Sequence, residues 1–405
     1  MSINTTIHLR SFCIRVLSLF YIPFLILGCS GSTDGDQRFE VKEGQFISVQ
    51  LDNQTSPAEQ YTQYIKDYKG REAYAVHVKN RAAIKIYDLA SGELFEEIKI
   101  PTSGPEAIRS VDCFYIHNSD SIFLSQGLLF KLLLVNQEMN ILKTIDLMPE
   151  DADWDPKTYT TTSNELGVMI FDMKRDFYVN EFNVAGQILP FMSPYKHKAN
   201  VEGLLRAISL DREIYSKFGT FPESMKGKTW TSTMAYFYSR VNKVNGDFIL
   251  SFGASTDIQV YDNSYKFKSS YYASSKKLKD ISHYVNPDPT REQEMEYYMN
   301  MPVHGGIYHD VENGFFYRIA KYPRGKEYDL YKSDFIDPMA NPRDLCIIVL
   351  DKDYKKVAEF DIKQPEDGVY YDMCFANKNG LYIPYVDLNN EDVLYFKNFK
   401  VHEKM

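Results

Sequence analysis

The sequence predicts an all-β fold, a six-bladed β-propeller with four-stranded antiparallel blades, from a recurring unit and from its composition. The unit is clearest at Ile84–Ile100, where two alternating apolar runs flank a turn at Ser91-Gly92. Successive side chains of a strand point to opposite faces, so this pattern predicts a β-hairpin.

The hairpin unit recurs five more times along the chain. The further copies are Leu132–Leu147, Phe177–Met192, Ile258–Ser274, Cys346–Ile362 and, truncated, Val393–Val401. Another short strand with a polar turn precedes each copy, at Ala73–Val78, Asp120–Ser125, Glu165–Phe171, Gly246–Phe252, Gly314–Ile319 and Gly380–Val386. Radial repetition of such units is typical of a β-propeller, in which each blade takes about 45 to 55 residues.

The composition agrees with a large β-sheet core. With 31 Tyr and 26 Phe, aromatic residues reach 15% and hydrophobic residues 44%. Aromatic side chains favour strands, and no helical periodicity extends over a domain, which argues against a helical fold.

The last unit, Asp372–Val401, is one strand short, whereas Phe46–Leu51 precedes the first full unit. Propellers close by pairing a strand from one terminus into the blade at the other, which removes exposed edges. We therefore expect Phe46–Leu51 to pair with the final blade, and residues 39–405 to form a single propeller domain.

Residues 1–28 are typical of a signal peptide, with Arg10 and Arg15 before an apolar run from Val16 to Gly28. This run is too short to span a bilayer comfortably. Ile26-Leu27-Gly28-Cys29 resembles a bacterial lipobox, although Leu27 is bulkier than the usual occupant. By this resemblance the Cys29 thiol is lipidated and anchors the chain in a membrane; the alternative is an ordinary signal peptide with an incidental cysteine.

Residues 29–38 then form the lipidated cysteine and a flexible tether, because Ser30–Gln37 has two Gly and no apolar residue. We expect an exported protein, lipid-anchored to the cell envelope at the outer membrane. Removing Arg10 and Arg15, the only charged residues of 1–28, takes the formal charge from −9 to −11. The absence of a basic stripe to neutralise phosphates argues against nucleic-acid binding, and we expect no nucleic-acid partner.

Three cysteines lie in the propeller, Cys113, Cys346 and Cys374. An odd count without CxxC spacing gives neither a disulfide framework nor a zinc site, although one pair remains open in an oxidising compartment. We expect these cysteines to be small buried hydrophobes, and we expect no metal and no cofactor.

Three insertions lengthen the spacing between units, at 193–233, 276–300 and 322–344. The first contains Val201–Ser209, which fits a short helix or a strand, and the second ends in Arg291–Asn300, which is helical in pattern. Insertions of this length usually emerge on one face and often carry function.

Known catalytic signatures are absent from the sequence: there is no GxSxG, HExxH, P-loop or GxGxxG after a strand. The densest polar cluster runs from His304 to Asp310. Two His and an Asp are suited to metal ligation or general-base chemistry, but His304 and His309 have opposite parity, so only a bend at Gly305-Gly306 would bring them together. The candidate ligand-binding residues are His117, His304, Tyr308, His309, Asp310 and Arg318.

Two further sets of residues have both a binding and a structural interpretation. His77, His117 and Asp372 occupy comparable strands of different blades, where they either converge on the central channel or satisfy neighbouring backbone groups. The tyrosine-rich runs suit sugar stacking or core packing. These runs are Tyr236-Phe237-Tyr238, Tyr271-Tyr272 and Tyr297-Tyr298.

The order of several short motifs resembles a family of Bacteroidota propeller-like lipoproteins, a domain of unknown function, over roughly Phe39 to Val401. The motifs are Leu51–Pro57, Ile86–Glu93, Tyr115–Phe123, Phe218–Pro222, Asp257–Asp262 and Phe315–Ile319. The resemblance implies a propeller fold and a location in the cell envelope. It implies no activity and no catalytic residue.

Two functions follow as hypotheses. The first is a non-catalytic binding or scaffold propeller that recognises a glycan, peptide or protein partner. The alternative is a hydrolase or lyase whose site lies in the channel, which the fold alone does not support.

Overall fold

The computed structural model describes residues 38–146, 154–155, 160–161, 169–172, 178–179, 183–190, 202–209, 215–324, 343–363, 368–369 and 373–404, apart from 58, 60, 110, 127, 128, 130, 279, 287–289 and 388. All of these residues belong to one compact unit, Gly35–Met405. The expected signal peptide, Cys29 and residues 29–37 of the tether lie outside them. Among the described residues, no helix has the length and apolar character to cross a membrane.

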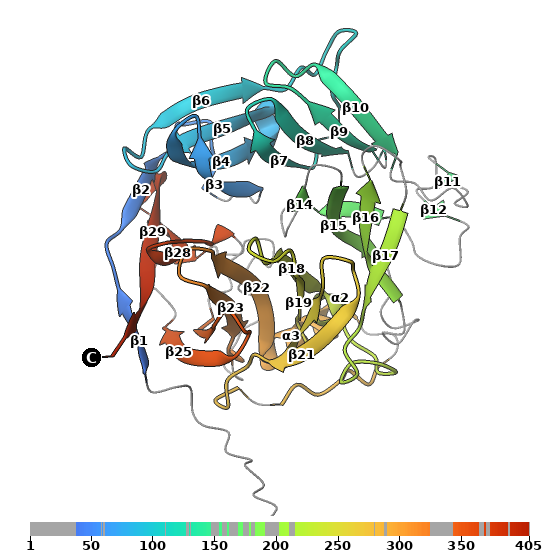
Figure 1. Ribbon diagram of the computed structural model, residues 1–405, viewed down its shortest axis with the longest axis vertical. Helices are drawn as coiled ribbons and strands as arrows, with labels where there is room; N and C mark the ends of the chain where they lie inside the picture. Colours follow the sequence, from blue (N-terminus) through green and yellow to red (C-terminus); the bar gives the residue numbers. More distant parts are fainter. Residues whose placement is uncertain are drawn as a thin grey trace, which may run out of the picture. The chain divides into compact units, whose positions relative to one another are not determined.

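The fold is an all-β propeller built from four-stranded antiparallel blades (Figure 1). The first two blades are β3 (Thr62–Tyr68), β4 (Arg71–Val78), β5 (Ala83–Asp88) and β6 (Leu94–Lys99), then β7 (Cys113–Asn118), β8 (Ser121–Gln126), β9 (Lys131–Val135) and β10 (Ile141–Asp146). Two later blades are β18 (Phe237–Val241), β19 (Phe248–Phe252), β20 (Asp257–Tyr261) and β21 (Phe267–Tyr272), then β22 (Val303–Asp310), β23 (Phe315–Lys321), β24 (Leu345–Leu350) and β25 (Lys356–Ile362).

Further sheets complete the unit. A five-stranded sheet contains β13 (Met169–Asp172), β14 (Tyr178–Val179), β15 (Asn183–Pro190), β16 (Glu202–Ser209) and β17 (Tyr215–Thr220), and β11 (Trp154–Asp155) pairs with β12 (Thr160–Thr161). The last blade contains β26 (Gly368–Val369), β27 (Phe375–Asn377), β28 (Gly380–Asp387) and β29 (Asn390–Glu403), joined by β1 (Phe39–Glu43) and β2 (Ile47–Gln50). The helices are short: η1 (Lys79–Arg81), α2 (Ser232–Ala235) and α3 (Arg291–Asn300).

The core lies in the seams between neighbouring sheets, because both faces of a blade are covered. Every residue of β24, Leu-Cys-Ile-Ile-Val-Leu, is buried, and so is every residue of β22. Ile347 and Val349 pack toward the last blade, while Cys346 and Ile348 pack toward β18–β21. A strand buried on both faces is a continuous apolar run, whereas β21, the outermost strand of its blade, has no buried residue.

The expected closing strand is confirmed. β2 pairs with β29 in antiparallel register, with Ile47 opposite Phe396 and Gln50 opposite Val393. The structure adds β1, which also pairs with β29, so the N-terminal segment contributes two strands to the last blade. The truncated unit Val393–Val401 is therefore the middle of one 14-residue strand.

The segment 193–233 is only partly an insertion. β16 pairs with β15, and β17 pairs with β16, so residues 202–220 complete the sheet that begins with β13. Val201–Ser209, which fitted a helix or a strand, is thus a strand from Glu202. The hairpin Phe177–Met192 supplies the β14–β15 pair instead of the two outer strands of this sheet.

The β20–β21 and β24–β25 hairpins share one turn design. Asp262 and Asp351 each accept two backbone N–H groups of their own turn, at 2.8–3.0 Å. Tyr265 and Tyr354 follow in the left-handed region, with φ of +66° and +62°. Their rings enter the seam with the preceding sheet, where the Tyr354 hydroxyl donates to Asp247 Oδ2 at 3.0 Å. These turns therefore join one blade to the next.

Candidate functional site

The bend at Gly305-Gly306 is present and puts both histidines on the face of β22 that carries Ile307, but their side chains make separate contacts. The register with β23 shifts between His304, opposite Ala320, and Ile307, opposite Arg318. His304 lies against the β20–β21 segment, whereas the His309 ring stacks on Phe316 at 4.1 Å between ring centroids. In the described part of the chain, no group of three His, Cys, Asp or Glu side chains is placed to hold a metal ion.

Arg318 is fully buried, and its guanidinium is enclosed by five acceptors. They are Ser251 Oγ at 2.9 Å from Nε, the carbonyl oxygens of Thr256 and Ala273 at 3.0 and 2.8 Å from one terminal nitrogen, and those of Phe252 and Ser255 at 3.2 and 2.8 Å from the other. A guanidinium has five N–H donors, so the chain itself uses all of them. Burial lowers the Arg318 pKa to about 9.

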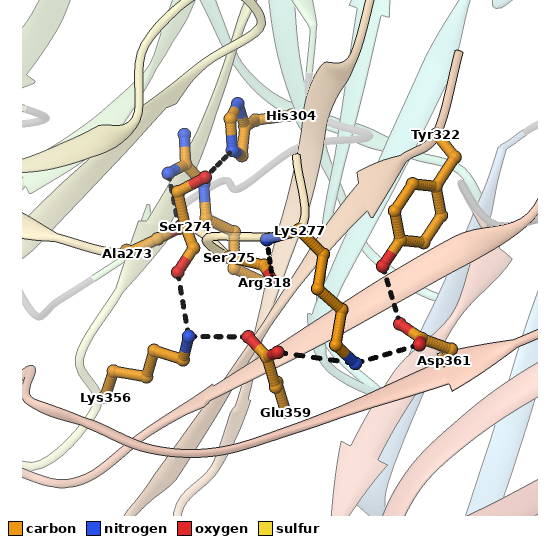
Figure 2. Close-up of polar contacts among 10 residues, drawn as sticks. All are labelled: Ala273, Ser274, Ser275, Lys277, His304, Arg318, Tyr322, Lys356, Glu359 and Asp361. Carbon is orange, nitrogen blue, oxygen red and sulfur yellow. Dashed lines mark hydrogen bonds and ion pairs between the residues drawn. The ribbon is translucent and has the colours of Figure 1, made fainter. Parts of the chain in front are cut away.

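His304 and Ser274 form a buried pair beside Arg318 (Figure 2). His304 Nε2 lies 2.9 Å from Ser274 Oγ, and both side chains are 1% exposed. Burial, with the Arg318 charge second, holds the His304 pKa well below its ordinary value. His304 Nδ1 has no hydrogen-bond partner among the described residues. A serine and a histidine at this distance resemble a nucleophile and its base, but no described carboxylate orients the ring and solvent does not reach the hydroxyl.

A network of four charges lies next to this pair and reaches the surface (Figure 2). Lys277, which is half exposed, contacts Asp361 at 2.9 Å and Glu359 at 3.4 Å, and Lys356 contacts Glu359 at 2.5 Å. The Tyr322 hydroxyl donates to Asp361 Oδ1 at 2.8 Å. Two ammonium groups balance two carboxylates, so the network has no excess charge with which to attract an ion.

Cys346 pairs with Asp361 across β24 and β25, at the edge of the network. Burial, followed by the charges of Glu359 and Asp361, raises the pKa of its thiol to about 12. A thiol held in this form is a poor nucleophile. Cys113, Cys346 and Cys374 are all buried, as expected from the sequence.

Two other candidates, Asp310 and Tyr308, have partners within or next to β22. Asp310 is fully buried and accepts the backbone N–H and side-chain amide of Asn313 at 3.0 and 2.7 Å, which closes the β22–β23 turn. Burial raises the Asp310 pKa. The Arg240 guanidinium lies 5.3 Å from the Tyr308 ring centroid, and Arg240 Nε donates to the Ile307 carbonyl at 2.8 Å.

The candidates from other blades do not join this group. His117 is exposed on β7, and His77 is buried on β4 beside the rings of Tyr61 and Phe114. Asp372 lies outside the described residues. The structure therefore brings together His304 and Arg318, and it places Tyr308, His309 and Asp310 farther along β22.

The buried histidines predict acid sensitivity. Burial is the first cause that lowers the pKa of His77 and of His309 to about 4, from an ordinary 6.5. The unfolded chain binds more protons between these values, so the free energy of unfolding is fully retained above pH 6.5 and falls as the pH drops toward 4.

We expect a loss of a few kcal/mol between pH 7 and 4.5, at about 1.4 kcal/mol per pKa unit. Urea denaturation at both pH values measures it. His309→Phe should shrink the difference between the two pH values. An unchanged difference would show that His309 is protonated equally in both states.

Arg343, which links two insertions, has no local sequence pattern that marks it. It is 6% exposed, and its guanidinium donates to the carbonyl oxygens of Tyr322 at 2.5 Å, of Tyr298 at 3.3 Å and of Met301. The last two acceptors lie at the C-terminal end of α3, where backbone carbonyls lack helical partners. The proximity of Glu359 and Asp361 could be predicted from their spacing, because residues two apart on a strand share a face.

Described residues of the three insertions are joined by backbone hydrogen bonds. The Tyr284 N–H donates to the Thr229 carbonyl at 3.0 Å, and the Arg324 N–H donates to the Met299 carbonyl at 2.9 Å. One buried apolar cluster contains residues of the first two insertions. They are Phe221, Met225, Trp230, Tyr298 and Met299. The predicted helix is confirmed as α3, which begins with a capping box of Thr290 and Gln293.

Residues 38–361 match the sequence model of a family described as a domain of unknown function, DUF4221. Among solved structures, a DUF4221 family member from Bacteroides vulgatus is 16% identical and gives a TM-score of 0.73 over 91% of this chain and 99% of that chain. A protein of Bacteroides fragilis described as exported is 11% identical, with a TM-score of 0.48 over 92% and 98% of the two chains.

Virginiamycin B lyase from Staphylococcus aureus is 13% identical, with a TM-score of 0.37 over 89% of this chain and 99% of that chain. At 16% identity, the similarity to the Bacteroides vulgatus structure concerns the fold alone. We conclude nothing from the other two structures, whose TM-scores are below 0.5. The sequence has no significant match among curated proteins.

Proposed function

Because the chain belongs to the DUF4221 family, whose members share a domain of unknown function, we propose a function from its own residues. The protein is an exported, lipid-anchored propeller of six blades that binds a glycan, peptide or protein without catalysis. The sheet of β13–β17 serves as the sixth blade, between β7–β10 and β18–β21. Cys29 carries the lipid.

One observation carries the binding function: the side chains suited to catalysis are buried and occupied, while described residues of the insertions are hydrogen-bonded to one another and include an exposed apolar side chain. Arg318 uses all its donors within the chain, and Ser274 and His304 are 1% exposed. By contrast, Val285 of the second insertion is 80% exposed. Binding residues are usually placed on loops that a rigid scaffold positions.

A thermal-shift screen of the full chain against glycan and peptide panels tests this function. A ligand at 100 times its Kd stabilises a protein by about 2.7 kcal/mol, which raises Tm by a few degrees. Val285→Asp should abolish the shift, whereas Leu142→Asp, at a 56% exposed position of β10, should preserve it. Conversion of the bound ligand to product, or loss of the shift only in the Leu142 variant, would contradict the proposal.

The anchor is tested separately. We expect Cys29→Ser to abolish incorporation of labelled fatty acid and to release the protein from membranes, because the thiol is the acylated group. Cys13→Ser, within the expected signal peptide, is the matched control and should retain both label and membrane association. Persistent labelling of the Cys29 variant would place the acyl group on another residue, and absence of label from the wild-type chain would assign residues 1–28 to an ordinary signal peptide.

A further inference from the structure

The N-terminal segment closes the last blade but has little burial of its own. None of the five residues of β1 is buried, and only Val49 is buried in β2. Among the described residues, both strands pair only with β29. Segments with few buried contacts and exposed backbone hydrogen bonds open at lower free energy than a core.

After β2 the chain crosses to the first blade. The Gln50 N–H donates to the Gly92 carbonyl at 2.8 Å, in the turn between β5 and β6. The Leu51 N–H donates to the Asp392 carbonyl at 2.7 Å, at the start of β29. Gln50 and Leu51 thus touch the first and last blades at once.

An ion pair between a buried ammonium and a partly exposed carboxylate holds this crossing. Lys85, in the middle of β5, is 1% exposed, and its ammonium donates to Asp52 Oδ2 and, at 3.1 Å, to Thr55 Oγ1. The Thr55 hydroxyl and the Gln54 N–H donate to Asp52 Oδ1 at 2.7 and 3.1 Å, which fixes the carboxylate. Within the described residues, Asp52 is the one carboxylate that forms an ion pair with Lys85. An ammonium buried without a partner is costly, so Lys85 requires the segment in place.

We propose that Asp52 and Lys85 form a latch, and that residues 38–57, here called the clasp, open as a unit when the latch breaks while the blades stay folded. Opening frees these roughly 20 residues, a reach of up to about 66 Å at roughly 3.3 Å per residue. If Cys29 anchors the chain as proposed above, the clasp sets how far the propeller extends from the membrane. The latch itself does not depend on that anchor.

Hydrogen exchange of the full chain, read by mass spectrometry, tests the latch. Asp52→Asn should make the amides of β1 and β2 exchange at least tenfold faster, with those of β22–β24 unchanged. Lys85→Met combined with Asp52→Asn removes the buried charge together with its partner and should return β1 and β2 to within about threefold of the wild type, since burying an apolar side chain needs no counter-charge. Thr55→Val is a milder change than Asp52→Asn. It should also make the amides of β1 and β2 exchange faster, but by a smaller factor.

Two results would overturn the proposal. Unchanged exchange in β1 and β2 for both Asp52→Asn and Thr55→Val would show that the ion pair does not hold the clasp. Equal acceleration in every blade would show that the clasp opens only with global unfolding. If Asp52→Asn does not fold, the Thr55→Val pattern alone decides between these outcomes. Lipid labelling is independent of each result.

Discussion

Arg318→Met is expected to lower the free energy of unfolding by about 3–5 kcal/mol, because it leaves buried acceptors without their donor. Four backbone carbonyl groups of 252–273 and the Ser251 hydroxyl lose a hydrogen bond together. The removal of a desolvated charge offsets part of this loss. Arg318→Lys should recover little, because an ammonium has three donors and cannot match the planar fork.

Urea denaturation at pH 7 measures this effect, and Arg71→Met is the matched control. Arg71 is half exposed and pairs with Asp88 at 2.6 Å, so its loss should cost less than the loss of the fully buried Arg318. Equal stability of the Arg318 variant and the wild type would contradict the structural role. It would return Arg318 to the candidates for ligand binding.

Gly92→Ala is expected to destabilise the protein by about 2–5 kcal/mol, through backbone strain and a steric clash. Gly92 has φ of +76°, and a Cβ there would lie 2.3 Å from the Ser48 carbonyl oxygen. A left-handed alanine costs about 1–2 kcal/mol, and displacing the backbone of β2 adds about 1–3 kcal/mol. The clash lies where β2 of the last blade meets the β5–β6 turn of the first blade, so relieving it requires these two segments to move apart.

Gly70→Ala separates the backbone strain from the steric clash. Gly70 has φ of +82°, but a Cβ at this position meets no atom within 4 Å. Its loss of stability should therefore be the strain alone, and the difference between the two variants in urea denaturation measures the clash. If both variants lose the same free energy, the contact between Gly92 and Ser48 does not contribute to closure.

The hairpins could be predicted from the sequence because their signals are local. Alternation around Ser91-Gly92 gave β5 and β6, and the helical pattern of Arg291–Asn300 gave α3 at the same residues. The closing strand was also predictable, because the final unit lacked a strand that Phe46–Leu51 supplied. The five-stranded sheet was harder, since β16 carries no marked alternation that distinguishes a strand from a short helix.

The sequence by itself determined the repeat, the strands and the closure, because period-2 alternation and turn residues act over a few neighbouring positions. Only the tertiary structure decided what the polar residues do. In a propeller both faces of a middle strand are buried against other blades, so alternation does not tell an inward polar side chain from a channel residue. Arg318 and Lys85 occupy such strands, and their partners at 251–273 and 52–55 come from distant positions in the chain. Folding brings those acceptors to them, and this placement makes both residues structural.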